Sequence, residues 1–498
     1  MNNNIEQPVV KRDSLKKSSF FNILIKVFAY IIPLILSPYL YRTLNVSGIG
    51  EYTFQYSYVS YFMLVAAFGF DSYGSKAITT ATNSKEEMTK RFWSVYYAKL
   101  FLGTVCLIIY FSMVFSHVFG DSSSIVSYCV LSLFIVGTMT DVTFLFTGIE
   151  KFQSISLRTL FIKLVNLVLI FIFVHKETDF LAYVIIMSAS FLLSSLAMYF
   201  PLHKYIGKPV FHGLNIWEDI KGASFFLIPS LAVTAYSTFG KTILGLFYDS
   251  TQVGYYESAV KVESVITSIS YAVVPILLAR NSYLIAIGRQ KESDELISKG
   301  FNALMDLALP ACVGVFCISD VFVPLFFGSA DAQAIPMLKI ACFAIPFVVI
   351  SGIVNYAYLI PRGKLKQVNI IPLIVCAFSF VCNLLTIRFI GPNGAAISLL
   401  FTEILSAVIF FFCSRKDINY RVILKKIIKP FDSALIMGIF YFLANKILTM
   451  FFSVNVSMVI CIILCAILYG VLLILFKDDF CYQYYKNIKF KIIARKQK

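Results

Sequence analysis

Four polar residues at helical spacing interrupt an apolar stretch near the middle of the chain. In VGYYESAVKVES (residues 253–264) and just after it, Glu257, Lys261, Ser264 and Ser268 follow one another at i, i+4, i+7 and i+11. On a helix this spacing places all four on one face. Such a stripe could bind an anionic group through the lysine or accept a cation on the glutamate. A structural role also stays open, because Glu257 and Lys261 are spaced for an ion pair within one helix.

Other polar and charged side chains fall inside or beside apolar stretches. An uncompensated charge in the middle of a membrane span costs about 2.5 to 3.5 kcal/mol on insertion scales, so we expect these groups to face water or a partner. The candidates for lining an open, water-filled cleft and binding an anionic substrate there are Lys261, Lys99, Lys241, Arg42, Lys26, Ser57 and Tyr56. The candidates for accepting a coupling ion are Glu403, Glu263 and Glu257. The alternatives are structural roles: the basic side chains reach the membrane interface, and the acids neutralise nearby lysines.

The remaining residue patterns argue against catalysis and metal binding. The four histidines lie in or beside loops without metal-ligand spacing, and the eleven cysteines are scattered with no Cys-x-x-Cys motif. The chain also lacks the glycine-rich phosphate-binding motif of ATP-driven pumps. We therefore expect no catalytic residues, no metal and no cofactor.

The elements that must position the candidate residues are membrane-spanning helices. The chain of 498 residues is 59% hydrophobic and only 14% charged, with a mean hydropathy of +0.80. A helix needs about 20 apolar residues to cross a bilayer, and the runs are continuously apolar rather than alternating as in a membrane β-barrel. They predict an all-α integral membrane protein with about fourteen spans, at residues 20–42, 51–74, 92–115, 124–146, 157–174, 179–200, 222–247, 254–279, 301–319, 334–359, 370–389, 393–413, 432–452 and 455–476.

The basic residues predict the orientation of these spans. If the N-terminus is cytoplasmic, 33 of the 43 Lys and Arg lie in segments facing the cytoplasm and four lie in outward loops. This asymmetry follows the positive-inside rule and places both termini in the cytoplasm. The net charge of +16 therefore indicates membrane topology and contact with lipid headgroups rather than nucleic-acid binding. The first apolar run lacks a cleavage pattern after it, so we expect it to remain as a helix.

The order of the spans predicts two like-oriented halves. A shift of 204 residues aligns Gly50 with Gly254 and Tyr52 with Tyr256, each at the start of the second span of its half. Because each half has six spans, the halves share one orientation and can enclose a central cleft as two pseudo-symmetric six-helix bundles. The predicted domains are a tail (1–19), an N-lobe (20–200), a cytoplasmic linker (201–221), a C-lobe (222–413), a second linker (414–431), two extra C-terminal helices (432–476) and a basic cytoplasmic tail (477–498).

Four prolines inside predicted spans are candidate hinges. Proline removes a backbone donor and clashes with the preceding turn, so it bends a helix. Membrane helices tolerate proline, so a simple kink without hinge function is the alternative. The candidate hinges are Pro33, Pro38, Pro229 and Pro275.

Two short motifs resemble a known family. SPYLYRTLNVSGIGEY (residues 37–52) resembles the first-loop signature of the Wzx-type polysaccharide flippases, and GPNGAA (residues 391–396) opens the twelfth span as in that family. The resemblance covers the whole chain in span number and repeat. Asn45 departs from the pattern, because the family usually has glycine there. These flippases belong to the multidrug/oligosaccharidyl-lipid/polysaccharide exporter superfamily.

The resemblance implies a function for the predicted cleft. It implies a bacterial inner-membrane protein that moves undecaprenyl-diphosphate-linked repeat units from the cytoplasmic to the outer leaflet by alternating access. It also implies coupling to a proton or sodium gradient, with a polysaccharide polymerase and chain-length machinery as partners. A multidrug exporter of the same superfamily is one alternative, since it would share the repeats. A membrane polysaccharide polymerase is another, although it should carry a large outer loop that the sequence lacks.

Overall fold

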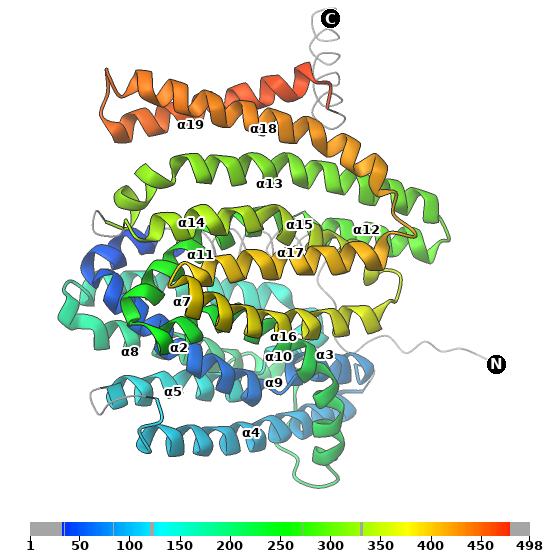
Figure 1. The fold of residues 1–498 in the computed structure, drawn as a ribbon. Coiled ribbons are helices and arrows are strands. Elements are labelled where there is room, and N and C mark those ends of the chain that lie inside the picture. Colours follow the sequence, from blue (N-terminus) through cyan, green and yellow to red (C-terminus); the bar gives the residue numbers. More distant parts are fainter. Residues whose placement is uncertain are drawn as a thin grey trace, which may run out of the picture. The chain divides into compact units, whose positions relative to one another are not determined.

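The computed structural model describes residues 32–478 except 34, 83, 120–123, 272 and 329–331. Within these residues every regular element is a helix, which confirms the predicted all-α fold (Figure 1). By its internal contacts the chain divides between Thr242 and Ile243 into two compact units.

Many of the helices can cross a bilayer. Ten described helices are long and apolar enough to span a membrane, and an eleventh span results if the bent pair α11 and α12 is counted as one. The protein is therefore a multi-pass membrane protein. The count of fourteen stays a prediction. The predicted first span lies mostly outside the described residues, Lys26 lies wholly outside them, and the predicted spans 51–74 and 157–174 are not among the helices counted.

The first unit contains the helices up to most of α10. Its helices are α2 (Asn45–Ala67), α3 (Phe70–Thr80), α4 (Lys85–Phe115), α5 (Ile125–Thr140), α6 (Thr143–Gly148), α7 (Phe152–Phe173), α8 (Phe180–Leu196), α9 (Leu202–Tyr205) and α10 (Ile216–Phe247). α5 packs against α2, α4 and α8, and α3 packs against α6. The predicted spans 51–74 and 124–146 are each broken into one long and one short helix, which the sequence did not predict.

The two breaks have different causes. Between α2 and α3, Phe68 and Gly69 both have left-handed backbone, with φ of 43° and 77°. A Cβ atom on Gly69 would lie 2.6 Å from the Ala223 carbonyl oxygen, so a larger residue cannot occupy this break without a shift. Between α5 and α6, the helix ends at Thr140 and the chain turns through Asp141 in an extended conformation.

The second unit contains a helix hairpin and a long three-helix group. Its elements are α11 (Ser250–Tyr271), α12 (Val274–Ala286), α13 (Gln290–Phe326), α14 (Ala334–Ala341), α15 (Ile345–Gly352), the π-helix η6 (Ile353–Leu359), α16 (Leu365–Ile390), α17 (Gly394–Ser414), α18 (Tyr420–Leu448) and α19 (Val454–Leu475). α16 and α17 pair as the hairpin, and α18 packs along both α13 and α19 (Figure 1). α18 begins inside the predicted linker 414–431, so part of this linker is helical.

The candidate hinge prolines lie in different settings. Pro275 lies in the first turn of α12, beside the break at which α11 and α12 are bent by 41°. Pro229 lies inside the continuous helix α10. Pro33 and Pro38 lie in helical backbone near the start of the described chain, where the Ser37 hydroxyl donates to the Pro33 carbonyl at 2.6 Å. A hinge role stays a prediction for all four.

Candidate functional site

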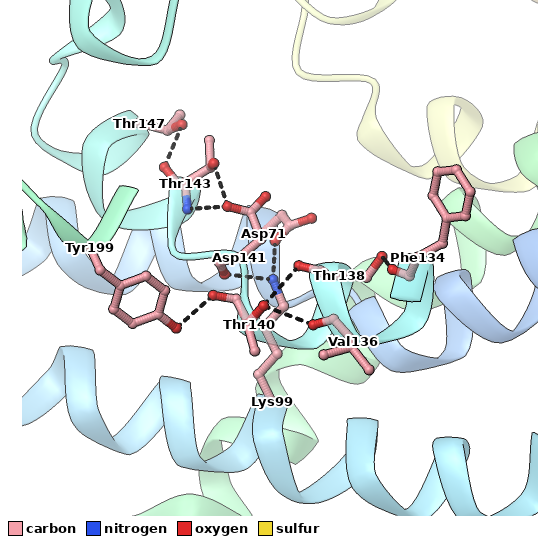
Figure 2. Close-up of polar contacts among 11 residues, drawn as sticks. Asp71, Lys99, Phe134, Val136, Thr138, Thr140, Asp141, Thr143, Thr147 and Tyr199 are labelled. Carbon is pink, nitrogen blue, oxygen red and sulfur yellow. Dashed lines mark hydrogen bonds and ion pairs between the residues drawn. The ribbon is translucent and has the colours of Figure 1, made fainter. Parts of the chain in front are cut away.

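A lysine in the middle of α4 connects the two broken spans of the first unit. The Lys99 side chain is 0% exposed, and its Nζ atom donates to Asp71 Oδ1 at 2.8 Å and to the Asp141 carbonyl oxygen at 3.0 Å (Figure 2). Asp71 lies in the first turn of α3, and Asp141 follows the last residue of α5. We call Asp71, Lys99 and Asp141 the lysine junction.

The break after α5 creates the acceptors for this junction. The last carbonyl groups of a helix lack donors within the helix and need other partners. Here Lys99 donates to the Asp141 carbonyl, and the Tyr199 hydroxyl donates to the Thr140 carbonyl at 2.7 Å. Since the single hydroxyl proton of Tyr199 is used there, Tyr96 is the donor in its 2.5 Å contact with Tyr199. Lys99 and Tyr199 thus support the broken end of α5 directly, and Tyr96 on α4 supports it through Tyr199.

The Asp141 carboxylate has a separate role from its carbonyl. Its Oδ1 atom accepts the Thr143 backbone N–H at 2.9 Å and the Thr143 hydroxyl at 2.5 Å, so it caps the start of α6 (Figure 2). Arg158 on α7 lies close enough for its charge to interact with Asp141. The buried Nε and Nη1 atoms of Arg158 have no hydrogen-bond partner among the described residues. Asp141 therefore interacts with two cationic side chains, with Lys99 through its carbonyl group and with Arg158 through its charge.

The junction can act as an electrostatic tie within the membrane. Ionisable groups inside spans pair with one another or with backbone carbonyls, and Lys99 does both. Its pairing with Asp71 is asymmetric, because the Asp71 side chain is 59% exposed while Lys99 is fully buried. Lys99 was predicted to line an open cleft, but in this structure its ammonium group faces the interior of the first unit. Sequence reasoning missed the junction, although the need of a buried lysine for a counter-charge pointed to a partner.

The other predicted anion-binding residues are spread over different surroundings. Ser57 is only 1% exposed, and its hydroxyl donates to the Phe54 carbonyl and accepts from Thr242 at 3.0 Å. The expectation that Ser57 lies on an open face is therefore corrected. Tyr56 is half-buried between the rings of Tyr52 and Phe134. Among the other candidates, Arg42 is exposed and Lys241 is half-buried.

The polar stripe on α11 is present as predicted from its spacing. Glu257, Lys261 and Ser268 are half-buried and Ser264 is exposed. Glu263 faces away from this stripe and is 7% exposed, as is Glu403 on α17. These two acids lie close enough for their charges to interact, which the sequence could not show. A role for any of them in ion coupling stays a prediction.

A second charged cluster lies where η6 and the α17–α18 loop meet. The Tyr358 hydroxyl donates to Asp417 Oδ2, and Lys364 Nζ donates to the same carboxylate oxygen at 3.0 Å. Arg362 pairs with Asp294, and its guanidinium lies 4.3 Å from the centre of the Tyr358 ring. Sequence reasoning missed this cluster, because its members come from three separate segments. The contacts fasten the loop after α17 to the end of η6.

Asp417→Asn should weaken this loop contact in a pH-dependent way. The hydrogen bonds from Tyr358 and Lys364 hold the pKa of Asp417 below its ordinary value. A lowered pKa contributes stability above the ordinary value, near 3.9, and this contribution is lost as the pH falls through the folded pKa. We expect the variant to lose about 0.2 to 1 kcal/mol at pH 7, since the pair is partly exposed. Thermal unfolding from pH 3 to pH 8 should show this difference constant above pH 5 and shrinking below pH 4; a difference that grows in acid would contradict the assignment.

An apolar cavity of about 390 Å³ lies in the second unit. Residues of α13, α18 and α19 form most of its lining, including Leu307, Gly314, Gly438 and Ala466. The small residues Gly314, Gly438 and Ala466 leave room between the helices. The cavity presents almost no polar surface, so it suits a hydrocarbon chain rather than a sugar or a phosphate.

The fold of the chain is similar to the folds of solved membrane transporters. It matches a structure titled "Lipid II flippase MurJ, inward closed conformation" with a TM-score of 0.71 at 15% identity, covering 93% of this chain and 99% of that one. It also matches an outward-facing multidrug transporter of the MATE family with a TM-score of 0.53 at 13% identity, covering 83% and 98% of the two chains. At these identities the likeness concerns the fold alone.

The sequence identifies the family more closely. The chain belongs to the family described as "Polysaccharide biosynthesis protein", whose model matches residues 15–278. It is 24% identical over 395 residues to a protein named "Putative O-antigen transporter" from Escherichia coli (strain K12), covering 79% of this chain and 94% of that protein. This family membership agrees with the resemblance found in the sequence motifs.

Proposed function

We propose that the protein is a flippase that moves undecaprenyl-diphosphate-linked oligosaccharide units from the cytoplasmic to the outer leaflet for the synthesis of surface polysaccharide. The observation that carries this proposal is the family membership, together with similarity to an O-antigen transporter over 94% of its length. The fold supports it, since its likeness to a lipid II flippase is stronger than its likeness to a multidrug transporter.

The chemistry of such a substrate fits some of the candidate residues better than others. A diphosphate carries about two negative charges and is strongly disfavoured in hydrocarbon, so it needs cations along its path. Lys261, Lys241 and Arg42 each keep some exposed surface and are the proposed binding residues. Lys99 and Ser57 are buried and act within the first unit. The apolar cavity beside α19 is not required for this step.

Ion coupling and location complete the proposal. We assign coupling to a proton or sodium gradient to Glu263 and Glu403, with Glu257 as a third candidate, because the first two acids are buried near each other. The protein acts in the bacterial inner membrane with both termini in the cytoplasm, as the distribution of basic residues predicts. Its proposed partners are the polysaccharide polymerase and the chain-length machinery, which use the translocated units.

Deleting the gene in its host tests the proposed function in the cell. We expect surface polysaccharide to be lost and lipid-linked repeat units to accumulate in the inner leaflet, with recovery on re-expression. A multidrug exporter is the second candidate, favoured by the MATE-like fold. That function predicts unchanged polysaccharide and greater sensitivity to cationic drugs, which would contradict the flippase proposal.

A further inference from the structure

We infer that Lys99 is a positioning residue that exchanges between two carboxylates, Asp71 and Asp141, as the first unit changes conformation. In the structure Lys99 is bound to Asp71 and to the backbone carbonyl of Asp141. In the second position it leaves Asp71 and takes the Asp141 carboxylate. The role of this exchange in transport rests on the proposed function.

The unequal burial of the ion pair makes Asp71 the partner that is released. The Lys99 side chain is 0% exposed, so it cannot lose one carboxylate without gaining another acceptor. The Asp71 side chain is 59% exposed, so water can replace Lys99 around its carboxylate at little cost. Breaking the ion pair therefore costs little free energy on the Asp71 side, provided that Lys99 binds a second anion.

Asp141 supplies the second anion. Lys99 Nζ already lies 3.0 Å from the carbonyl oxygen of Asp141, so the carboxylate of the same residue is the anion that we expect Lys99 to take next. In the structure this carboxylate caps Thr143 at the start of α6. Arg158 on α7 also lies close enough for its charge to interact with Asp141. When Lys99 takes the Asp141 carboxylate, two contacts change at the same time. The hydrogen bonds of Asp141 to Thr143 at the start of α6 weaken, and the ion pair between Lys99 and Asp71 on α3 breaks.

The breaks allow the short helices α3 and α6 to move as one piece. They pack closely, since a Cβ atom on Gly74 would lie 2.6 Å from the Phe144 ring, and the Thr79 hydroxyl donates to the Gly148 carbonyl at 3.0 Å. Each joins its long helix through a non-helical break, and Lys99 contacts a residue at both breaks. The lysine junction thus sets the angle between the α3 and α6 pair and the long helices.

Two conservative substitutions distinguish an exchange from a fixed structural tie. Asp141→Asn retains the backbone carbonyl and the ability to cap Thr143, but it removes the second anion. Asp71→Asn weakens the first position and favours the second. We expect the amide hydrogens of α3 to exchange with deuterium roughly tenfold more slowly in Asp141→Asn and roughly tenfold faster in Asp71→Asn than in the unchanged protein. A fixed tie predicts faster exchange in Asp71→Asn but unchanged exchange in Asp141→Asn, because Asn retains the carbonyl that Lys99 contacts. Exchange in Asp141→Asn that is not slowed would overturn the inference.

Transport provides the second readout. In liposomes, Asp141→Asn should lower the rate of lipid-linked glycan exchange between leaflets by roughly tenfold without changing the substrate concentration at half-maximal rate. The matched control is Asp249→Asn, because Asp249 caps α11 by accepting the Gln252 N–H at 2.9 Å and has no buried lysine in its capping contact. Equal rates for the two variants would overturn the inference. If the unchanged protein exchanges no glycan, the proposed function fails, while the deuterium measurement still decides the inference.

Discussion

Replacing Asp71 by leucine should destabilise the protein more than replacing Lys99 by methionine. Asp71→Leu removes the carboxylate bound to a fully buried ammonium group, and removing one partner of a buried pair costs about 3 to 5 kcal/mol. The loss is smaller by whatever Lys99 regains on taking the Asp141 carboxylate. Lys99→Met leaves a carboxylate that is 59% exposed, so we expect a loss of about 1 to 2 kcal/mol, mainly from the unpaired Asp141 carbonyl. Thermal unfolding of both variants in the same detergent shows which substitution lowers the stability more.

A second Lys–Asp pair in the chain provides the control for this comparison. Lys339 on α14 lies 2.8 Å from Asp320 on α13, the same distance as in the lysine junction, but the Lys339 side chain is 28% exposed. We expect Asp320→Leu to cost no more than about 1 kcal/mol, because water and the Phe316 ring stabilise the remaining lysine. If Asp71→Leu proves no more harmful than Asp320→Leu, Lys99 does not depend on Asp71.

Substituting Gly394 by alanine should disrupt the α16–α17 hairpin. A Cβ atom at this position would lie 2.2 Å from the carbonyl oxygen of Thr386 and 2.6 Å from the amide nitrogen of Ile387. Both are backbone atoms, so the hairpin itself must shift, and we expect a loss of about 3 kcal/mol, at the upper end of overpacking effects. Denaturation of the variant in detergent should show a clearly lowered midpoint.

Gly470→Ala is the matched control within a helix. No atom lies within 4 Å of a Cβ added to Gly470 in α19, so alanine should be neutral or stabilise by about 0.5 to 1 kcal/mol through its helix preference. Equal stability of the two alanine variants would show that the hairpin tolerates a side chain at Gly394. The same close approach explains why the GPNGAA motif carries a glycine at this position.

The sequence predicted where most helices lie, since a long apolar run in a bilayer has few alternatives to a helix. The predicted ranges 370–389, 393–413 and 455–476 agree with α16, α17 and α19 to within a few residues. It did not predict the break within 124–146, because this range carries no proline there and its sole interior glycine lies before the break. The break is stabilised by donors from other segments, Lys99 and Tyr199, and such long-range contacts leave no periodic signal.

The candidate site was predictable as a set of residue types but not as an arrangement. Helical spacing correctly placed Glu257, Lys261 and Ser264 on one side of α11. Spacing within one helix says nothing about which helix faces it, so Ser57 and Lys99 were expected on open faces although both are buried. The pairing of Lys99 with Asp71 joins positions 28 residues apart on separate helices. Only their common need for a counter-charge in the membrane links them in the sequence.

Leaflet exchange by the purified protein in liposomes tests the proposed flippase function most directly. The substrate is an undecaprenyl-diphosphate-linked oligosaccharide, and the fraction of glycan that an external lectin or glycosidase reaches over time is the readout, with and without an imposed proton or sodium gradient. We predict exchange well above that of protein-free liposomes, accelerated by one of the gradients. Correctly folded protein that leaves the glycan in its original leaflet under every gradient would contradict the proposed function.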